Sequence, residues 1–84
     1  MQVGDFIEDT YKSFDGHIVA VTRGVITEVN IESENRGYVK YHCSQIHFSE
    51  VDNSLDGMLG TMVMRHSRNI VVLSQHGGKV VQNG

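Results

Sequence analysis

The 84-residue chain carries seven Lys and Arg against ten Asp and Glu, for a formal net charge of −3, and 39% of its residues are hydrophobic. This length leaves room for one core, so we expect a single domain over residues 1–84, and the composition excludes a disordered chain. No apolar run approaches the roughly 20 residues that a membrane span needs, and because the start has neither a basic nor an apolar signal region, we expect no signal peptide. Because a lone cysteine cannot form an internal disulfide, we expect a reducing, cytoplasmic setting or the inside of a larger particle.

The charge is divided unevenly along the chain. All ten acids lie in residues 1–56, where only four basic residues accompany them and the charge is −6. Residues 57–84 hold Arg65, Arg68 and Lys79 and no acid, for a charge of +3. Surfaces of opposite sign can pair with each other, with a second copy or with an anionic partner.

Valine, isoleucine, threonine and tyrosine, together with nine glycines and no proline, predict an all-β fold. Residues 17–31 alternate with a period of two and carry valines at odd positions, and we expect a bulge or corner at Gly24. Polar loops are expected over Asp9–Gly16 and Glu32–Gly37. Strands are expected over Val3–Glu8, His17–Ile31, Tyr38–Cys43 and Gln45–Val51.

The C-terminal third is predicted as a three-stranded meander over residues 61–82. Glycines break residues 52–60, so one helical turn is expected there, with Leu55, Met58 and Leu59 facing inward. Gly77–Gly78 predicts a tight hairpin turn. Its strands are apolar on both faces, which indicates either a central position in the core or cover by another subunit. We expect Ile70, Val71, Val72, Leu73 and Val80, with Met62 or Met64, to divide between core and interface.

The first 52 residues resemble a small SH3-like barrel of the KOW, Tudor-like or phage and bacterial adaptor type. The resemblance rests on Val3-Gly4-Asp5, Gly24-Val25-Ile26-Thr27-Glu28-Val29, the acidic loop, Tyr38-Val39-Lys40-Tyr41 and Ile46-His47-Phe48-Ser49-Glu50-Val51. It implies barrel-like strands over residues 1–52. The expected fold class is therefore a small SH3-like barrel or a strongly bent antiparallel sheet, with a C-terminal meander that completes the barrel or forms an added arm.

No motif in the sequence points to catalysis, a metal or a cofactor. His42, Cys43 and His47 form the only local cluster of metal-ligand type. Neighbouring residues on a strand point to opposite faces, which separates His42 from Cys43, whereas His42 and His47 can converge across a turn. We expect surface histidines and a small buried cysteine, no enzyme and no bound metal.

A charged segment, Arg65-His66-Ser67-Arg68-Asn69, carries the sharpest ligand hypothesis. At a hairpin tip, two guanidinium groups, a hydroxyl and an amide can grip a phosphate or a carboxylate. Lys40 and Tyr38 are the further candidate ligand or partner residues, and Tyr38 and Phe48 can flank single-stranded bases. The competing interpretation is a solvated loop whose arginines pair with carboxylates of the same domain.

Two functions follow from these patterns. The first is a non-catalytic module that binds another protein or a second copy of itself, in which the arginine tip selects the partner through acids at the rim. By analogy with the resemblance, it would be a phage or bacterial adaptor, an inhibitor or a virion subunit, located in the cytoplasm or within a phage particle. The alternative is binding of nucleic acid or a phosphorylated small ligand through Arg65 and Arg68.

Overall fold

The computed structural model describes residues 1–33, 36–50, 56–75 and 79–80. Strands dominate this part of the chain, so the all-β prediction is confirmed. The helical elements within it are two single 3-10 turns, η1 (Asp56–Met58) and η2 (Ser67–Asn69). The strands are β1 (Phe6–Lys12), β2 (Ile18–Ser33), β3 (Arg36–Ser49), β4 (Met62–His66), β5 (Ile70–Gln75) and β6 (Lys79–Val80).

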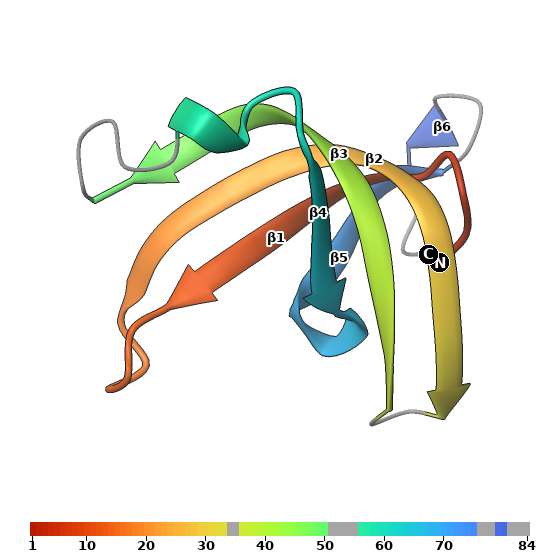
Figure 1. The fold of residues 1–84 in the computed structure, drawn as a ribbon, viewed down its shortest axis with the longest axis horizontal. Coiled ribbons are helices and arrows are strands. Elements are labelled where there is room, and N and C mark those ends of the chain that lie inside the picture. The colour runs from red at the N-terminus through yellow and green to blue at the C-terminus, as the bar shows by residue number, and fades with distance from the viewer. Residues whose placement is uncertain (34–35, 51–55, 76–78, 81–84) are drawn as a thin grey trace.

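These strands form one antiparallel sheet in the order β4-β3-β2-β1-β5-β6. Figure 1 shows that the long strands β2 and β3 arch over the molecule, while β4 and β5 descend beneath the arch. The β1–β2 hairpin projects away from the rest of the sheet (Figure 1). The sheet is therefore strongly bent around one core, as the sequence predicted.

The tail does not form the expected meander. Its first strand, β4, pairs with β3, and its second, β5, pairs with β1 on the other side of the sheet. The η2 turn connects them, in place of the expected hairpin tip. The prediction failed because strands that are adjacent in sequence were assumed to pair, whereas β5 instead covers the free edge of β1. The final hairpin is present, with Gln75 opposite Lys79 across residues 76–78, which lie outside the described part of the chain.

Two expected loops are shorter than the sequence indicated. The first strand runs on to Lys12, because Asp9 points inward and has a partner on β4. The strands expected over 38–43 and 45–51 are one continuous strand, β3. The expected acidic turn belongs partly to β2 and β3, with residues 34–35 outside the described part.

Gly24 occupies the corner that the sequence predicted. The β2–β3 register shifts between Arg23 and Gly24, and a Cβ at this position would overlap the His42 carbonyl oxygen and the Tyr41 ring. Only glycine allows the two strands to approach this closely. The register shifts again before Thr22 and after Ile26, so the β2–β3 pairing is irregular on both sides of Gly24.

Between Ala20 and Ile26 the buried face of β2 is the even-numbered one, whereas beyond the register shift after Ile26 the odd-numbered Val29 packs against the core. Ala20, Thr22, Gly24 and Ile26 are buried, whereas Val25 on the other face is exposed. Thr22 and Gly24 on the inner face lie beside Tyr41, whose ring and hydroxyl occupy the space next to them. In this part of the strand the odd-numbered valines therefore lie on the less buried face.

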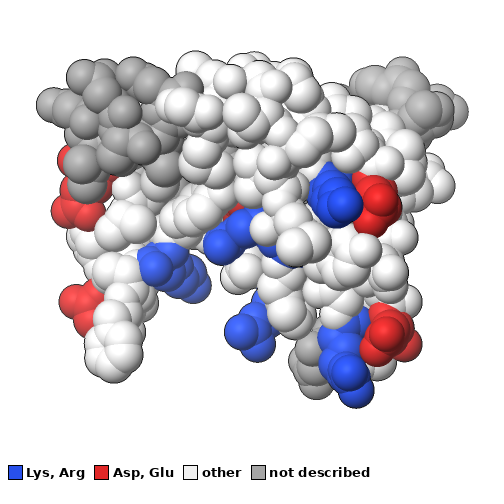
Figure 2. Space-filling model, in the orientation of Figure 1, with Lys and Arg blue, Asp and Glu red and all other residues white. Residues whose placement is uncertain are grey.

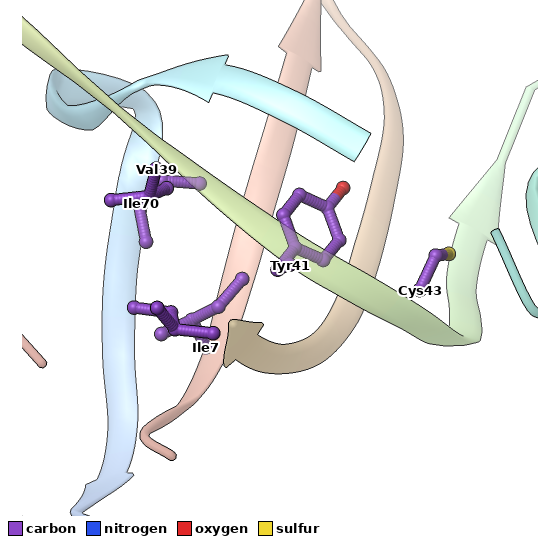
Figure 3. Close-up of a cluster of buried hydrophobic side chains, with 6 residues drawn as sticks. Ile7, Val39, Tyr41, Cys43 and Ile70 are labelled. Carbon is purple, nitrogen blue, oxygen red and sulfur yellow. The ribbon is translucent and has the colours of Figure 1, made fainter. Parts of the chain in front are cut away.

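The core brings together residues from β1, β2, β3 and β5. It consists of Ile7, Ile26, Val39, Tyr41, Cys43 and Ile70, and Figure 3 shows Ile7, Val39 and Ile70 grouped beside the Tyr41 ring. Met58 of η1 packs against this cluster as expected, whereas Leu59 is exposed and Leu55 lies outside the described residues. Among the described residues, no helix has the length and apolar character to cross a membrane.

Candidate binding surface

Arg65 does not lie at an exposed tip but reaches into the core. Its Nε donates to Asp9 Oδ1 at 3.0 Å, and a terminal nitrogen donates to the Thr10 carbonyl at 3.1 Å. The guanidinium carbon lies 4.1 Å from the centre of the Tyr11 ring, a cation–π contact. Arg65 is therefore already occupied by Asp9, Thr10 and Tyr11, and is not available to grip an external anion.

The second Asp9 oxygen is held by tyrosine. Tyr41 donates its hydroxyl to Asp9 Oδ2 at 2.7 Å, and Thr22 lies 2.6 Å from the same hydroxyl. Because the Tyr41 proton goes to Asp9, the Thr22 hydroxyl donates to Tyr41. Burial raises the pKa of Tyr41 and of Tyr11, whose hydroxyls lie 3.4 Å apart. Asp9, Arg65, Tyr41, Thr22 and Tyr11 thus form one internal network, which is structural.

His66 shapes the η2 turn. Its Nδ1 accepts from the backbone N–H of Arg68 at 3.1 Å, so the imidazole caps the turn. On β4 it lies opposite Tyr38, and the two residues line a hollow with Arg36. Tyr38 donates its hydroxyl to Glu28, which is also 3.8 Å from the Lys40 ammonium. Lys40 lines a different hollow, beside Met62 and Met64.

Arg68 lies on another side of η2. It lines a groove between the β1–β2 hairpin and the η2–β5 segment, together with Thr10, Lys12, Ile18, Asn69 and Val71. We call these six residues the cationic groove. Figure 2 shows lysine and arginine atoms gathered around a hollow in this part of the molecule. The five expected ligand residues therefore fall into the internal network (Arg65), two hollows on the β3–β4 side (Tyr38, His66, Lys40) and the cationic groove (Arg68).

The sequence analysis missed the residue at the tip of the β1–β2 hairpin. Phe14 has a relative exposure of 109%, so its side chain touches almost nothing. The turn beneath it is ordered: the Ser13 N–H donates to the His17 carbonyl at 2.7 Å, and the Gly16 N–H to the Ser13 carbonyl at 3.0 Å. Asp15 accepts from the Ser13 hydroxyl and from the His17 N–H, and its pKa is lowered by these bonds. A single aromatic in a polar loop was the signal available in the sequence.

The expected interface residues divide between inside and outside. Ile70 is buried in the core and Val72 packs against it. Val71 is exposed and lines the cationic groove, and Leu73 is half-buried. The side chain of Val80 lies outside the described part of the chain. Met62 and Met64 are both exposed on β4.

The His–Cys cluster does not converge. Cys43 is buried, with a pKa raised chiefly by burial, while His42 and His47 are exposed on β3. Within the described residues, no group of three or more His, Cys, Asp or Glu side chains is arranged to hold a metal ion. Comparisons of the chain with protein-family models, with curated proteins and with solved structures found no match.

Proposed function

We propose that this domain is a non-catalytic module that binds another protein through the β1–β2 turn, Ser13–His17. The observation that carries the proposal is the complete exposure of Phe14 on a hydrogen-bonded turn. A phenylalanine left in water gains the free energy of burial only when a partner covers it. Because the turn is already ordered, little conformational entropy is lost on binding, so this side chain is suited to be an interface anchor.

The chemistry-bearing residues support binding over catalysis. Asp9 and Arg65 are paired with each other inside the network, and Cys43 is buried with a raised pKa. A catalytic thiol needs the opposite, a lowered pKa and access to the substrate. The side chains that project outward are those of a contact surface, including Phe14, Met62, Met64 and Val71.

The proposal extends to the fold family and the setting. The strongly bent sheet, wrapped around one small core, supports the small SH3-like barrel that residues 1–52 resemble. By analogy, the module is an adaptor, an inhibitor or a virion subunit, in the cytoplasm or within a phage particle. Its partner is another protein or a second copy of the same chain, and sedimentation decides between these two.

Affinity capture from the cells that make the protein tests the role of Phe14. Wild type and Phe48→Ala, which truncates a half-exposed phenylalanine on β3, are expected to retain the partner, whereas Phe14→Ala loses it. Sedimentation equilibrium of the same three proteins reports whether the partner is a second copy. Phe14→Ala should leave the free energy of unfolding within about 0.5 kcal/mol of wild type, since the side chain packs against nothing. Identical capture and sedimentation for wild type and Phe14→Ala would overturn the proposal.

A further inference from the structure

The cationic groove contains two basic side chains that pair with no carboxylate among the described residues. In the described part of the chain, Arg23, Arg36, Lys40 and Arg65 each pair with a carboxylate within 4.0 Å. Lys12 and Arg68 have no such acid among the described residues, and both line the same groove. Its six lining residues include no acid, so two positive charges share one groove. An anionic group placed between them would be attracted by both.

The rest of the lining indicates what kind of anion fits. Ile18 and Val71 are both about half-exposed and contribute apolar walls. Thr10 and Asn69 add a hydroxyl and an amide that can hydrogen-bond to a carboxylate or to a peptide group. The η2 side is held in place, because His66 caps the turn and Ser67 is buried. A free phosphate would use the two cations but leave the apolar walls uncovered.

We infer that the cationic groove binds an acidic segment of the partner protein, in which carboxylates flank an apolar side chain. The carboxylates meet Lys12 and Arg68, and the apolar side chain covers Ile18 and Val71. The inference rests on the proposed function, since the groove begins two residues before Phe14 and extends the same contact surface. Phe14 supplies the buried area, and the groove supplies selection by charge.

A short peptide tests the groove separately from Phe14. The probe is the capped peptide Gly-Glu-Leu-Glu-Gly, with Gly-Gln-Leu-Gln-Gly and inorganic phosphate as the comparison ligands. Amide NMR shifts are followed during titration at about 20 mM and about 200 mM salt, which spans weak to strong screening. We expect shifts at residues 10–12 and 68–71 with the Glu peptide, weaker at the higher salt, and none of comparable size with the Gln peptide.

Two charge-matched double variants decide whether the effect is local. Lys12→Gln with Arg68→Gln removes two positive charges from the groove, and Arg36→Gln with Lys40→Gln removes two from elsewhere. The groove double variant is expected to bind the Glu peptide with about fivefold lower affinity, because each exposed charge contact contributes little. The second double variant should lower the affinity by less than about twofold.

Three outcomes would overturn the inference. The first is the absence of localised shifts up to about 10 mM peptide, because a dissociation constant above that value is weak even for two exposed charge contacts. The others are equal weakening by both double variants, and phosphate producing the same shifts at the same concentration as the Glu peptide. The peptide titration reports on the groove, whereas partner capture by Phe14→Ala reports on the anchor, so a failed groove and a failed Phe14 anchor are separate results.

Discussion

Arg65 on β4 and Asp9 on β1 meet across the inside of the sheet, 56 residues apart in sequence, with Nε 3.0 Å from Oδ1. The Asp9 side chain is completely buried, whereas Arg65 is 26% exposed. This ion pair joins two strands that share no ladder, since β4 pairs with β3 and β1 pairs with β2 and β5. It therefore holds β4 against β1 across the bent sheet.

Arg65→Met should lower the free energy of unfolding by about 3 kcal/mol, because it leaves the buried Asp9 carboxylate without its cation. Arg36→Met is the matched control, since Arg36 pairs with Glu32 on the surface and should change the stability by less than about 1 kcal/mol. Urea unfolding at neutral pH measures both variants. Equal stability of the two variants would show that the Asp9–Arg65 pair contributes no more than a surface pair.

Tyr41→Phe should lower the free energy of unfolding by about 1–3 kcal/mol, because Asp9 Oδ2 loses its donor and the Thr22 hydroxyl loses its acceptor. Tyr38→Phe removes an exposed hydroxyl that donates to Glu28, and should stay within about 0.5 kcal/mol of wild type. Urea unfolding compares the two variants. A Tyr38→Phe effect as large as that of Tyr41→Phe would contradict a special role for the buried network.

The stability should fall in alkali. Burial raises the pKa of Tyr11 and Tyr41 above the ordinary value of 10.0. Above that pH the unfolded chain loses these protons while the folded protein keeps them, so the free energy of unfolding decreases as pH rises. The slope approaches about 1.4 kcal/mol per pH unit for each tyrosine. Unfolding curves between neutral pH and alkali measure this slope, and Tyr41→Phe should reduce it; a flat profile would contradict the burial of both hydroxyls.

Gly24→Ala should destabilise the fold by at least about 3 kcal/mol, because the new methyl group overlaps the His42 carbonyl and the Tyr41 ring. Gly57→Ala is the control, since a Cβ there meets nothing within 4 Å and the residue has no positive φ. Thermal unfolding of the two variants gives the comparison. If Gly24→Ala melts at the wild-type temperature, β2 and β3 do not approach as closely as described.

Cys43 should react slowly with thiol reagents in the folded protein. The thiol is buried and its pKa is raised. The Cys43 backbone is hydrogen-bonded to the backbones of Thr61 and Gly60. At neutral pH, a disulfide reagent should label it at least about 100-fold more slowly than in the urea-unfolded chain, because labelling requires opening of the core. Arg65→Met should speed the labelling. Labelling of wild type at the unfolded rate would place the thiol at the surface.

The sequence predicted the local features of this fold and missed the long-range ones. Gly24 and the all-β character follow from neighbouring residues, and the structure bears them out. Pairing of the arginines with carboxylates of the same domain was one of the two interpretations, but the choice of Asp9 does not follow from the sequence, because nothing near either residue indicates a partner 56 positions away. Arg65 was therefore expected at a surface tip. Thr22 was overlooked as a core residue because its hydroxyl is polar, and only the Tyr41 hydroxyl beside it explains its burial.

The candidate binding surface was predicted in part. Arg68 is exposed, as the charge pattern indicated, but its neighbour in the groove is Lys12, which lies in the acidic half of the chain. The groove therefore draws its basic residues from both segments, so the division of charge along the sequence is not the division of charge on the surface. Phe14 was passed over because it interrupts a polar loop, and only its exposure in the folded turn distinguishes it from a residue that folds back onto the sheet.

The crossing from β4 to β5 has a consequence for how the chain folds during synthesis. Ile70 completes the core beside Ile7 and pairs opposite Asp9. The strands β1 and β5, which must meet, are therefore separated by most of the chain. A nascent chain that stops before residue 65 has an uncompensated Asp9, and one that stops before residue 70 has a bare β1 edge. Such intermediates are prone to pair with other chains. β5 must therefore leave the ribosome before it can pair with β1 and complete the core.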